Sequence, residues 1–185
     1  YLFEANLRAD ASSRFPKDSR WGYFPSVSAG WRITEESFVK DADINWLSNL
    51  KLRLGWGQTG NEELADDDIY PAIPTYAYGS YMFGNSLYST AYESRYVNSE
   101  LKWATVTNYE AALEAGFLNN RLGFELSVYK KKTKDMLLYL PVQGVLGMDA
   151  PAQNAGSMQN TGFDLSVFHN NRINKDFSYA INLNV

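Results

Sequence analysis

The sequence predicts an all-β chain whose antiparallel strands form one segment of a larger transmembrane β-barrel with long outer loops. Three observations predict this class. Apolar and polar residues alternate in seven separate segments, the connections between these segments differ strongly in length, and aromatic residues of the apolar faces gather near the segment ends. Alternation is typical of strands, because successive side chains of a strand point to opposite faces of its sheet.

Each of the seven segments has one apolar face. In chain order these faces are Tyr1, Phe3, Ala5, Leu7 and Ala9; Tyr23, Pro25, Val27, Ala29, Trp31 and Ile33; Leu50, Leu52, Leu54 and Trp56; Tyr109, Ala111, Leu113, Ala115 and Phe117; Leu122, Phe124, Leu126 and Val128; Phe163, Leu165 and Val167; Phe177, Tyr179, Ile181, Leu183 and Val185. Phe24 lies outside the pattern of the second segment. Period-two alternation of this kind predicts seven strands, each with one face away from water or against lipid.

The opposite faces carry charges near the middles of the strands. We predict that these side chains face the wet lumen of a barrel: Lys51, Arg53, Glu110, Glu114, Glu125 and Asp164. Alternation alone does not separate this arrangement from a soluble sandwich, in which the polar face looks at water.

The connections favour the membrane barrel. Residues 58–105 and 130–161 form long connections, whereas residues 118–121 and 168–176 form short ones. Outer-membrane barrels combine short periplasmic turns with long extracellular loops. Asn119 and Asn120 are therefore predicted to form a tight periplasmic turn, since Asn tolerates positive φ. Residues 34–49 depart from this rule, and their apolar residues predict a short helical turn.

Composition excludes several classes of protein. The 185 residues contain 17 Lys and Arg against 21 Asp and Glu, a net charge of −4 with no basic footprint for nucleic acid. There is no Cys and a single His, so Cys-based catalysis and multi-His metal centres are excluded. No run is apolar enough for a membrane-spanning helix, which needs about 20 apolar residues. No signal peptide is recognisable and both ends lie within alternating patterns, so we expect a piece of a longer chain.

Aromatic residues fill the long connection 58–105. Rings with polar tips suit a protein partner or the faces of sugars. We predict that they pack their loop and contact a partner rather than bind ligand directly; the candidates are Tyr70, Tyr76, Tyr78, Tyr81, Phe83 and Tyr88, with Tyr92 beside them.

Three further groups could carry chemistry, and each has a plainer explanation. The acidic run Asn61, Glu62, Glu63, Asp66, Asp67 and Asp68 could bind calcium, but it lacks the spacing of an EF-hand and is predicted to be a solvated loop. Glu110 and Glu114 are about 13 Å apart along a strand backbone, too far for a glycosidase pair unless their side chains converge. His169 is predicted to lie at the membrane interface. We therefore expect no enzyme activity, no metal and no cofactor.

Several stretches resemble the SusC/RagA family of TonB-dependent transporters. They are Leu50 to Asn61 (LKLRLGWGQTGN), Asn98 to Trp103, Phe117 to Leu122, Tyr129 to Leu137, and Asn154 to Phe163. The resemblance implies the later part of a 22-stranded, plugged outer-membrane barrel. It also implies TonB-driven import of glycans or oligopeptides, a SusD-like surface lipoprotein as partner, and possible homodimers of the complex. The plug, the TonB-contacting segment and the signal peptide are not recognised in this sequence. A soluble carbohydrate-binding β-sandwich and an outer-membrane hydrolase remain as alternatives.

Overall fold

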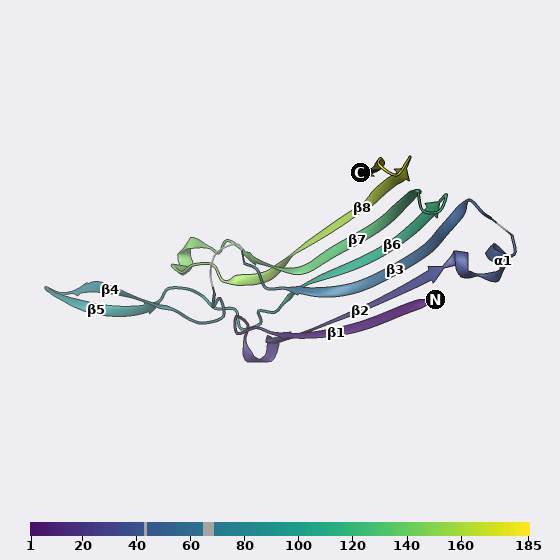
Figure 1. Ribbon diagram of the computed structural model, residues 1–185. Coiled ribbons are helices and arrows are strands. Elements are labelled where there is room, and N and C mark those ends of the chain that lie inside the picture. Colours follow the sequence, from purple (N-terminus) through teal and green to yellow (C-terminus); the bar gives the residue numbers. More distant parts are fainter. Residues whose placement is uncertain (43, 65–68) are drawn as a thin grey trace.

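The computed structural model describes residues 1–42, 44–64 and 69–185. Within them, seven strands form one antiparallel sheet in the order β1-β2-β3-β6-β7-β8-β9, so that each strand pairs with its neighbours along the chain (Figure 1). Their bounds are β1 (Leu2–Ala11), β2 (Trp21–Arg32), β3 (Leu47–Asn61), β6 (Ala104–Phe117), β7 (Leu122–Tyr139), β8 (Ala152–Arg172) and β9 (Ser178–Asn184). The predicted antiparallel sheet is confirmed, and it is an open, curved segment rather than a closed barrel.

The long connection 58–105 holds a hairpin that the seven alternating segments do not include. Strands β4 (Tyr76–Phe83) and β5 (Ser86–Glu93) form a separate two-stranded sheet, which projects away from the large sheet (Figure 1). Gly84 and Asn85 make its two-residue turn, with φ of 62° at Gly84. A glycine at the first central position suits the tight turns that join hairpin strands, so the Gly-Asn pair was the available signal.

The strands β7 and β8 are longer than predicted. They comprise 18 and 21 residues, so the connection expected at 130–161 shrinks to residues 140–151. A strand needs only about 9–11 residues to cross a bilayer. The additional residues begin at the lysine-rich stretch from Lys130, where the apolar alternation stops although the backbone pairing continues. The loss of alternation therefore marks the point where the apolar face of β7 ends, and the strand itself continues beyond it.

The connections at the opposite end of the sheet are compact. Residues 34–49 contain the helix α1 (Ser37–Lys40), which confirms the predicted helical turn, and the 3-10 turn η2 (Ile33–Glu35) leads into it. Lys40 Nζ donates to Glu35 Oε2 over 2.9 Å, and this contact lowers the pKa of the Glu35 carboxyl. The turn at 118–121 is also confirmed, with φ of 59° at Asn119 and 60° at Asn120. No helix among the described residues is long or apolar enough to span a bilayer.

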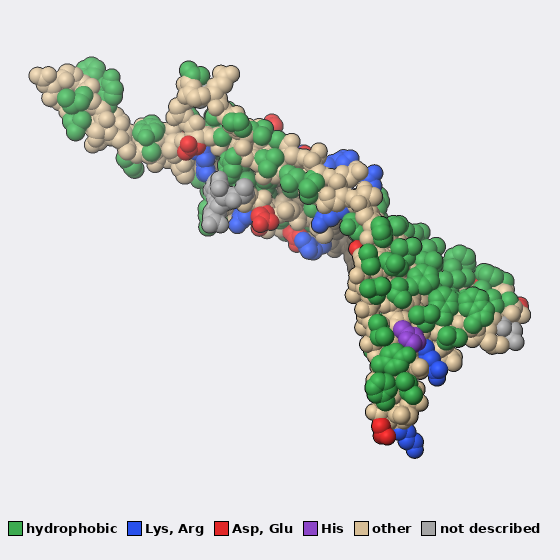
Figure 2. Space-filling model, turned by 90° about the horizontal axis from the view of Figure 1, so that it is seen from above, with side chains coloured by type: hydrophobic (Ala, Val, Ile, Leu, Met, Phe, Trp, Pro, Cys, Tyr) green, Lys and Arg blue, Asp and Glu red, His purple; other side chains and the backbone are tan. Residues whose placement is uncertain are grey.

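The register of the sheet collects the apolar faces of all strands on one side. Leu52 pairs with Leu113, Leu113 with Leu126, and Leu126 with Leu165, which gives a continuous row of leucines across four strands. Aromatic rings stack at the end with the short connections, as in the pair Trp46 and Phe117, whose centroids are 5.7 Å apart. Figure 2 shows hydrophobic side chains gathered over this end of the molecule. Along the whole apolar face many side chains are exposed within this chain, among them Leu54, Val128 and Phe163.

The buried core lies at the other end, between the sheet and its long connections. Its buried members are Phe15, Leu64, Leu101, Leu137 and Ala152, and Trp103 and Tyr139 pack against them. Trp103 Nε1 donates to the Arg20 carbonyl over 3.0 Å, and its ring contacts Phe24 edge-on. Phe24, the residue out of pattern in the second segment, thus joins the sheet to this core. The first connection carries the 3-10 turns of η1 (Lys17–Ser19), and residues 140–151 carry η3 (Gly144–Leu146).

Candidate functional site

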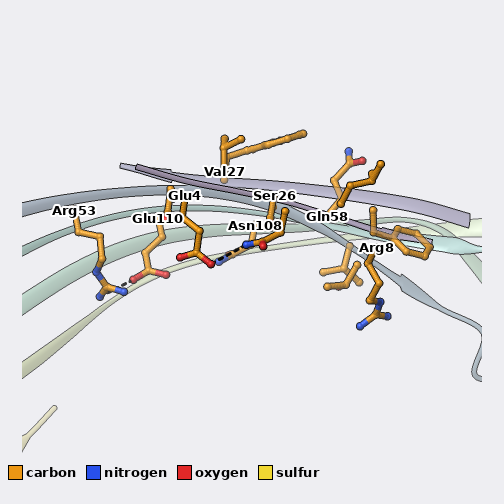
Figure 3. Close-up of a pocket in the computed structure, with 17 residues that line it drawn as sticks. Glu4, Arg8, Ser26, Val27, Arg53, Gln58, Asn108 and Glu110 are labelled. Atoms are coloured by element: carbon orange, nitrogen blue, oxygen red, sulfur yellow. Dashed lines mark hydrogen bonds and ion pairs between the residues drawn. The ribbon is translucent and has the colours of Figure 1, made fainter. Parts of the chain in front are cut away.

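A cluster of charges occupies the polar face of the sheet. Lys51 and Arg53 come from β3, Glu110 and Glu114 from β6, and Glu125 from β7, because the alternation places all five on the same side. Figure 3 shows Arg53 and Glu110 pointing to the inside of the curved sheet, away from Val27.

Arg53 is the centre of this cluster. Its guanidinium lies 2.9 Å from Glu125 Oε1, 3.2 Å from Glu110 Oε1 and 3.7 Å from Glu114 Oε1. Lys51 Nζ lies 3.2 Å from the same Glu114 oxygen. All five side chains are partly exposed, so water screens these attractions and each pair is weak by itself. The cluster holds three carboxylates against two cations and therefore presents a polar, slightly acidic wall.

The side chains of Glu110 and Glu114 converge. From their spacing of four residues along one strand we expected the two carboxylates to be too far apart for a glycosidase pair unless the side chains converge. Both carboxylates bend toward Arg53. Each is then engaged by the guanidinium of Arg53 and does not stand free beside the other. The geometry favours a structural and electrostatic role for the pair over glycoside hydrolysis.

A hollow of about 650 Å³ adjoins the cluster, between β1, β2, β3 and β6. Glu4, Asn6 and Arg8 of β1 line it together with Arg53 and Glu110 (Figure 3). These three β1 residues were not among the predicted site residues, although they share the polar face of the first segment. That parity was the signal that could have identified them.

Asp164 is on the same face but outside the ion-pair cluster. It lines a second hollow with Glu110, Ser127, Tyr129 and Lys131. The structure thus brings five of the six predicted lumen residues into direct contact and leaves the sixth next to them.

Replacing Arg53 by Gln is expected to lower the free energy of unfolding by about 1 kcal/mol, because three carboxylates then lose their shared cation. Lys51→Gln, which removes a contact to one carboxylate, should cost less. The loss for Arg53→Gln should shrink as salt is raised, since salt screens the partly exposed charges. Urea titration of the folded full-length protein at low and high salt measures both variants. Equal losses for the two variants would contradict a central role for Arg53.

The acidic run is only partly described. Glu63 donates its backbone N–H to Asn61 Oδ1 over 2.9 Å, and Arg14 donates to the Glu62 carbonyl over 3.4 Å. Asp66, Asp67 and Asp68 lie outside the described residues. Within the parts of the chain that the structure does describe, no three His, Asp or Glu side chains are grouped to hold a metal ion.

The hairpin presents the aromatic residues of the third connection on both of its faces. Tyr81 pairs with Tyr88, and Phe83 and Tyr92 share their face. Tyr76 and Tyr78 lie on the opposite face, whereas Tyr70 precedes the hairpin and accepts at its carbonyl from Arg95 over 3.1 Å. The expectation that these rings pack a loop core is wrong: Tyr78 is 85% and Phe83 74% exposed. A two-stranded hairpin is marginally stable by itself in water, and exposed aromatic clusters mark contact surfaces.

His169 lies among apolar and aromatic residues at the end with the short connections. It pairs with Leu122 and Ile181, and its ring centroid is 5.5 Å from that of Tyr179. No serine or carboxylate contact with its ring is found in the described residues, so the geometry does not suggest a catalytic triad.

Comparison with known proteins identifies relatives of the whole chain. The model of the family "TonB dependent receptor-like, beta-barrel" matches residues 1–185. The TonB-dependent receptor SusC of Bacteroides thetaiotaomicron is 42% identical over the full chain, which covers 18% of that protein. The TonB-dependent receptor P39 of Formosa agariphila is 31% identical over the full chain, which covers 17% of it.

Solved structures of the RagAB peptide importer have the same fold over this region. In its closed-closed state the match has a TM-score of 0.82 and 32% identity, and in its open-open state a TM-score of 0.81. Each match covers 98% of this chain and 19% of the other. The chain thus spans about a fifth of the length of the relatives that it matches.

Proposed function

Because the chain belongs to the TonB-dependent receptor β-barrel family, we propose that it forms part of the wall of an outer-membrane importer. In this proposal the leucine row faces lipid and the cluster around Arg53 faces the lumen. The observation that carries it is the two-sided sheet: one face is apolar and uncovered, and the other holds paired charges. Transmembrane barrels alternate lipid-facing apolar with lumen-facing polar residues in this way.

The height of the apolar band supports the membrane assignment. On β6 it extends from Tyr109 to Phe117, which is nine residues, and crossing a bilayer takes about 9–11. Aromatic residues stand at both limits, with Trp56 beside Tyr109 at one and Trp46 against Phe117 at the other. Such girdles are typical of the two membrane interfaces.

The proposed cargo is a glycan or an oligopeptide, and the proposed energy source is TonB acting through parts of the protein outside this chain. The identity to SusC and the likeness to the RagAB peptide importer support this cargo class without choosing between its members. We further propose that the β4–β5 hairpin lies outside the cell and helps to seat a SusD-like surface lipoprotein. Its exposed aromatic rings, and the absence of Lys and Arg from residues 58–93, resemble the core of a protein interface.

Accessibility of the two kinds of turn tests whether the chain crosses the membrane, as an importer wall must. A tag inserted between Gly84 and Asn85 of the full-length receptor is expected to be labelled on intact cells. The same tag between Asn119 and Asn120 should be labelled only after the outer membrane is permeabilised. Gly84 and Asn85 form a two-residue turn, and Asn119 and Asn120 lie in the middle of the four-residue turn 118–121. Both sites are tips of turns between paired strands, where insertions are tolerated. Labelling of both tags on intact cells would show that the chain does not cross, and reversed labelling would invert the proposed topology.

A further inference from the structure

A stripe of lysines continues β7 beyond the apolar band. Lys130, Lys132 and Lys134 occupy the same strand parity as Leu126 and Val128, so they share the outward face of the sheet. The stripe begins one row above Val128, at the level where Tyr109 marks the limit of the band. In the membrane orientation proposed above, this is the level of the lipid headgroups in the outer leaflet.

The neighbours of the stripe leave its positive charge uncompensated. Lys130 stands between Tyr109 and Thr161, and Lys132 between Thr107 and Gln159, while Lys134 faces Thr105. Each of these neighbours is a neutral side chain with a hydroxyl or amide group. Among the residues that the structure describes, no ion pair joins the three lysines to a carboxylate, and nearby Asp135 is already paired with Lys102 at 3.2 Å.

A groove of about 740 Å³ lies directly below Lys130 on the same face. Tyr109 and Phe163 stand on its two sides, and Leu54 and Val128 line it as well. Its floor is at Ala111, whose methyl group is much smaller than the side chains of Leu54 and Val128 in the same row of the register. The groove is therefore apolar below and positively charged at its upper end.

We propose that the groove and the lysine stripe together bind one phosphate-bearing lipid of the outer leaflet. An acyl chain lies over Ala111 between the two aromatic rings, and the phosphate lies against the ammonium groups of Lys130 and Lys132. Lysine is a compact point charge that binds phosphate, and its apolar stem can follow the groove while the charged end stays in the headgroup region. This inference rests on the proposed membrane orientation and adds a defined lipid site to it.

Lipid A binding to the full-length receptor in detergent, followed by native mass spectrometry, tests the site. Replacing Lys130, Lys132 and Lys134 together by Gln is expected to weaken lipid A binding on the order of 100-fold, since each lysine near an anionic headgroup contributes about 1 kcal/mol. Lys131→Gln is the matched control, because the Lys131 side chain lies on the opposite face. It should retain the wild-type Kd. Ala111→Trp, which fills the groove and keeps the lysines, should also weaken binding.

Two results would overturn the lipid site. One is a triple variant that folds and binds lipid A as tightly as the wild type. The other is displacement of lipid A by excess inorganic phosphate, which would indicate an ion site without a role for the groove. Quenching of Trp56 fluorescence by brominated acyl chains, measured against Trp56→Phe, separates failure of the lipid site from failure of the membrane orientation. If Trp56 is quenched but the triple variant binds lipid A as tightly as the wild type, only the lipid site is refuted. If Trp56 is not quenched, the membrane orientation itself is refuted.

Discussion

Replacing Leu126 by Arg is expected to destabilise the folded full-length barrel by about 2–4 kcal/mol, the cost of a charged side chain at the midplane of a bilayer on the lipid face of a barrel. Leu126 stands in the middle of the leucine row, between Leu113 on β6 and Leu165 on β8. The long Arg side chain has no wet region within easy reach from that depth. The fraction of receptor that folds into phospholipid vesicles, measured during urea titration, reports the loss.

Ser127→Arg is the matched control for this experiment. Ser127 is the next residue of β7, but its side chain lies on the polar face, opposite Asp164. An arginine there meets water and a carboxylate, so we expect less than about 1 kcal/mol of change. If Ser127→Arg destabilises the barrel as much as Leu126→Arg does, the two faces of the sheet do not differ in solvent, and the membrane assignment is wrong.

Removing the β4–β5 hairpin is expected to reduce co-purification of the surface lipoprotein at least about tenfold, because single aromatic anchors in an interface often contribute about 2 kcal/mol each. Uptake of labelled oligosaccharides or oligopeptides should fall with it. The structure indicates where to cut. Ser94 donates its N–H to the Thr75 carbonyl over 3.0 Å, and their hydroxyls are 2.9 Å apart, so a short Gly linker can join Thr75 to Ser94 after residues 76–93 are excised.

Assembly of the barrel itself should survive this excision, since β4 and β5 form a separate two-stranded sheet among the described residues. Heat-modifiable mobility of the full-length receptor on gels measures assembly independently of the partner. A milder variant, with Tyr81, Phe83 and Tyr88 all replaced by Ser, keeps the loop length and removes three of the four aromatic rings, all but Tyr92, from one face of the hairpin. Wild-type co-purification and uptake in both variants would exclude the hairpin from the partner interface.

Most of the sheet follows from local sequence. The alternation of residues 122–128 predicts both the strand and its two faces, because a strand presents successive side chains to opposite sides whatever lies around it. The turn at Asn119 and Asn120 also follows locally, since positive φ favours Asn. From this short turn alone the register of β6 and β7 could be derived, including the position of Glu114 opposite Glu125.

The ends of the strands and the presence of the hairpin were harder to predict from the sequence. From Lys130 onward β7 shows no apolar alternation, yet its backbone continues to pair with β8. In the proposed membrane orientation this part of the strand lies above the lipid, so neither of its faces needs to be apolar. The hairpin alternates weakly, with aromatic rings on both faces, because it has no single buried side. Alternation predicts strands that have one buried face, and it does not predict strands that lack one.

The charged cluster shows where local reasoning ends. Its members could be selected from the sequence because each lies on the polar parity of its own strand. Their contacts could not, because β3 and β6 are separated by residues 62–103, and nothing local sets the register that places Lys51 opposite Glu114. The convergence of three carboxylates on Arg53 depends on that register and on the curvature of the sheet. Periodicity therefore determined which side each residue faces, whereas pairing between distant segments decided which residues meet, since such pairing is set by long-range packing and hydrogen bonding.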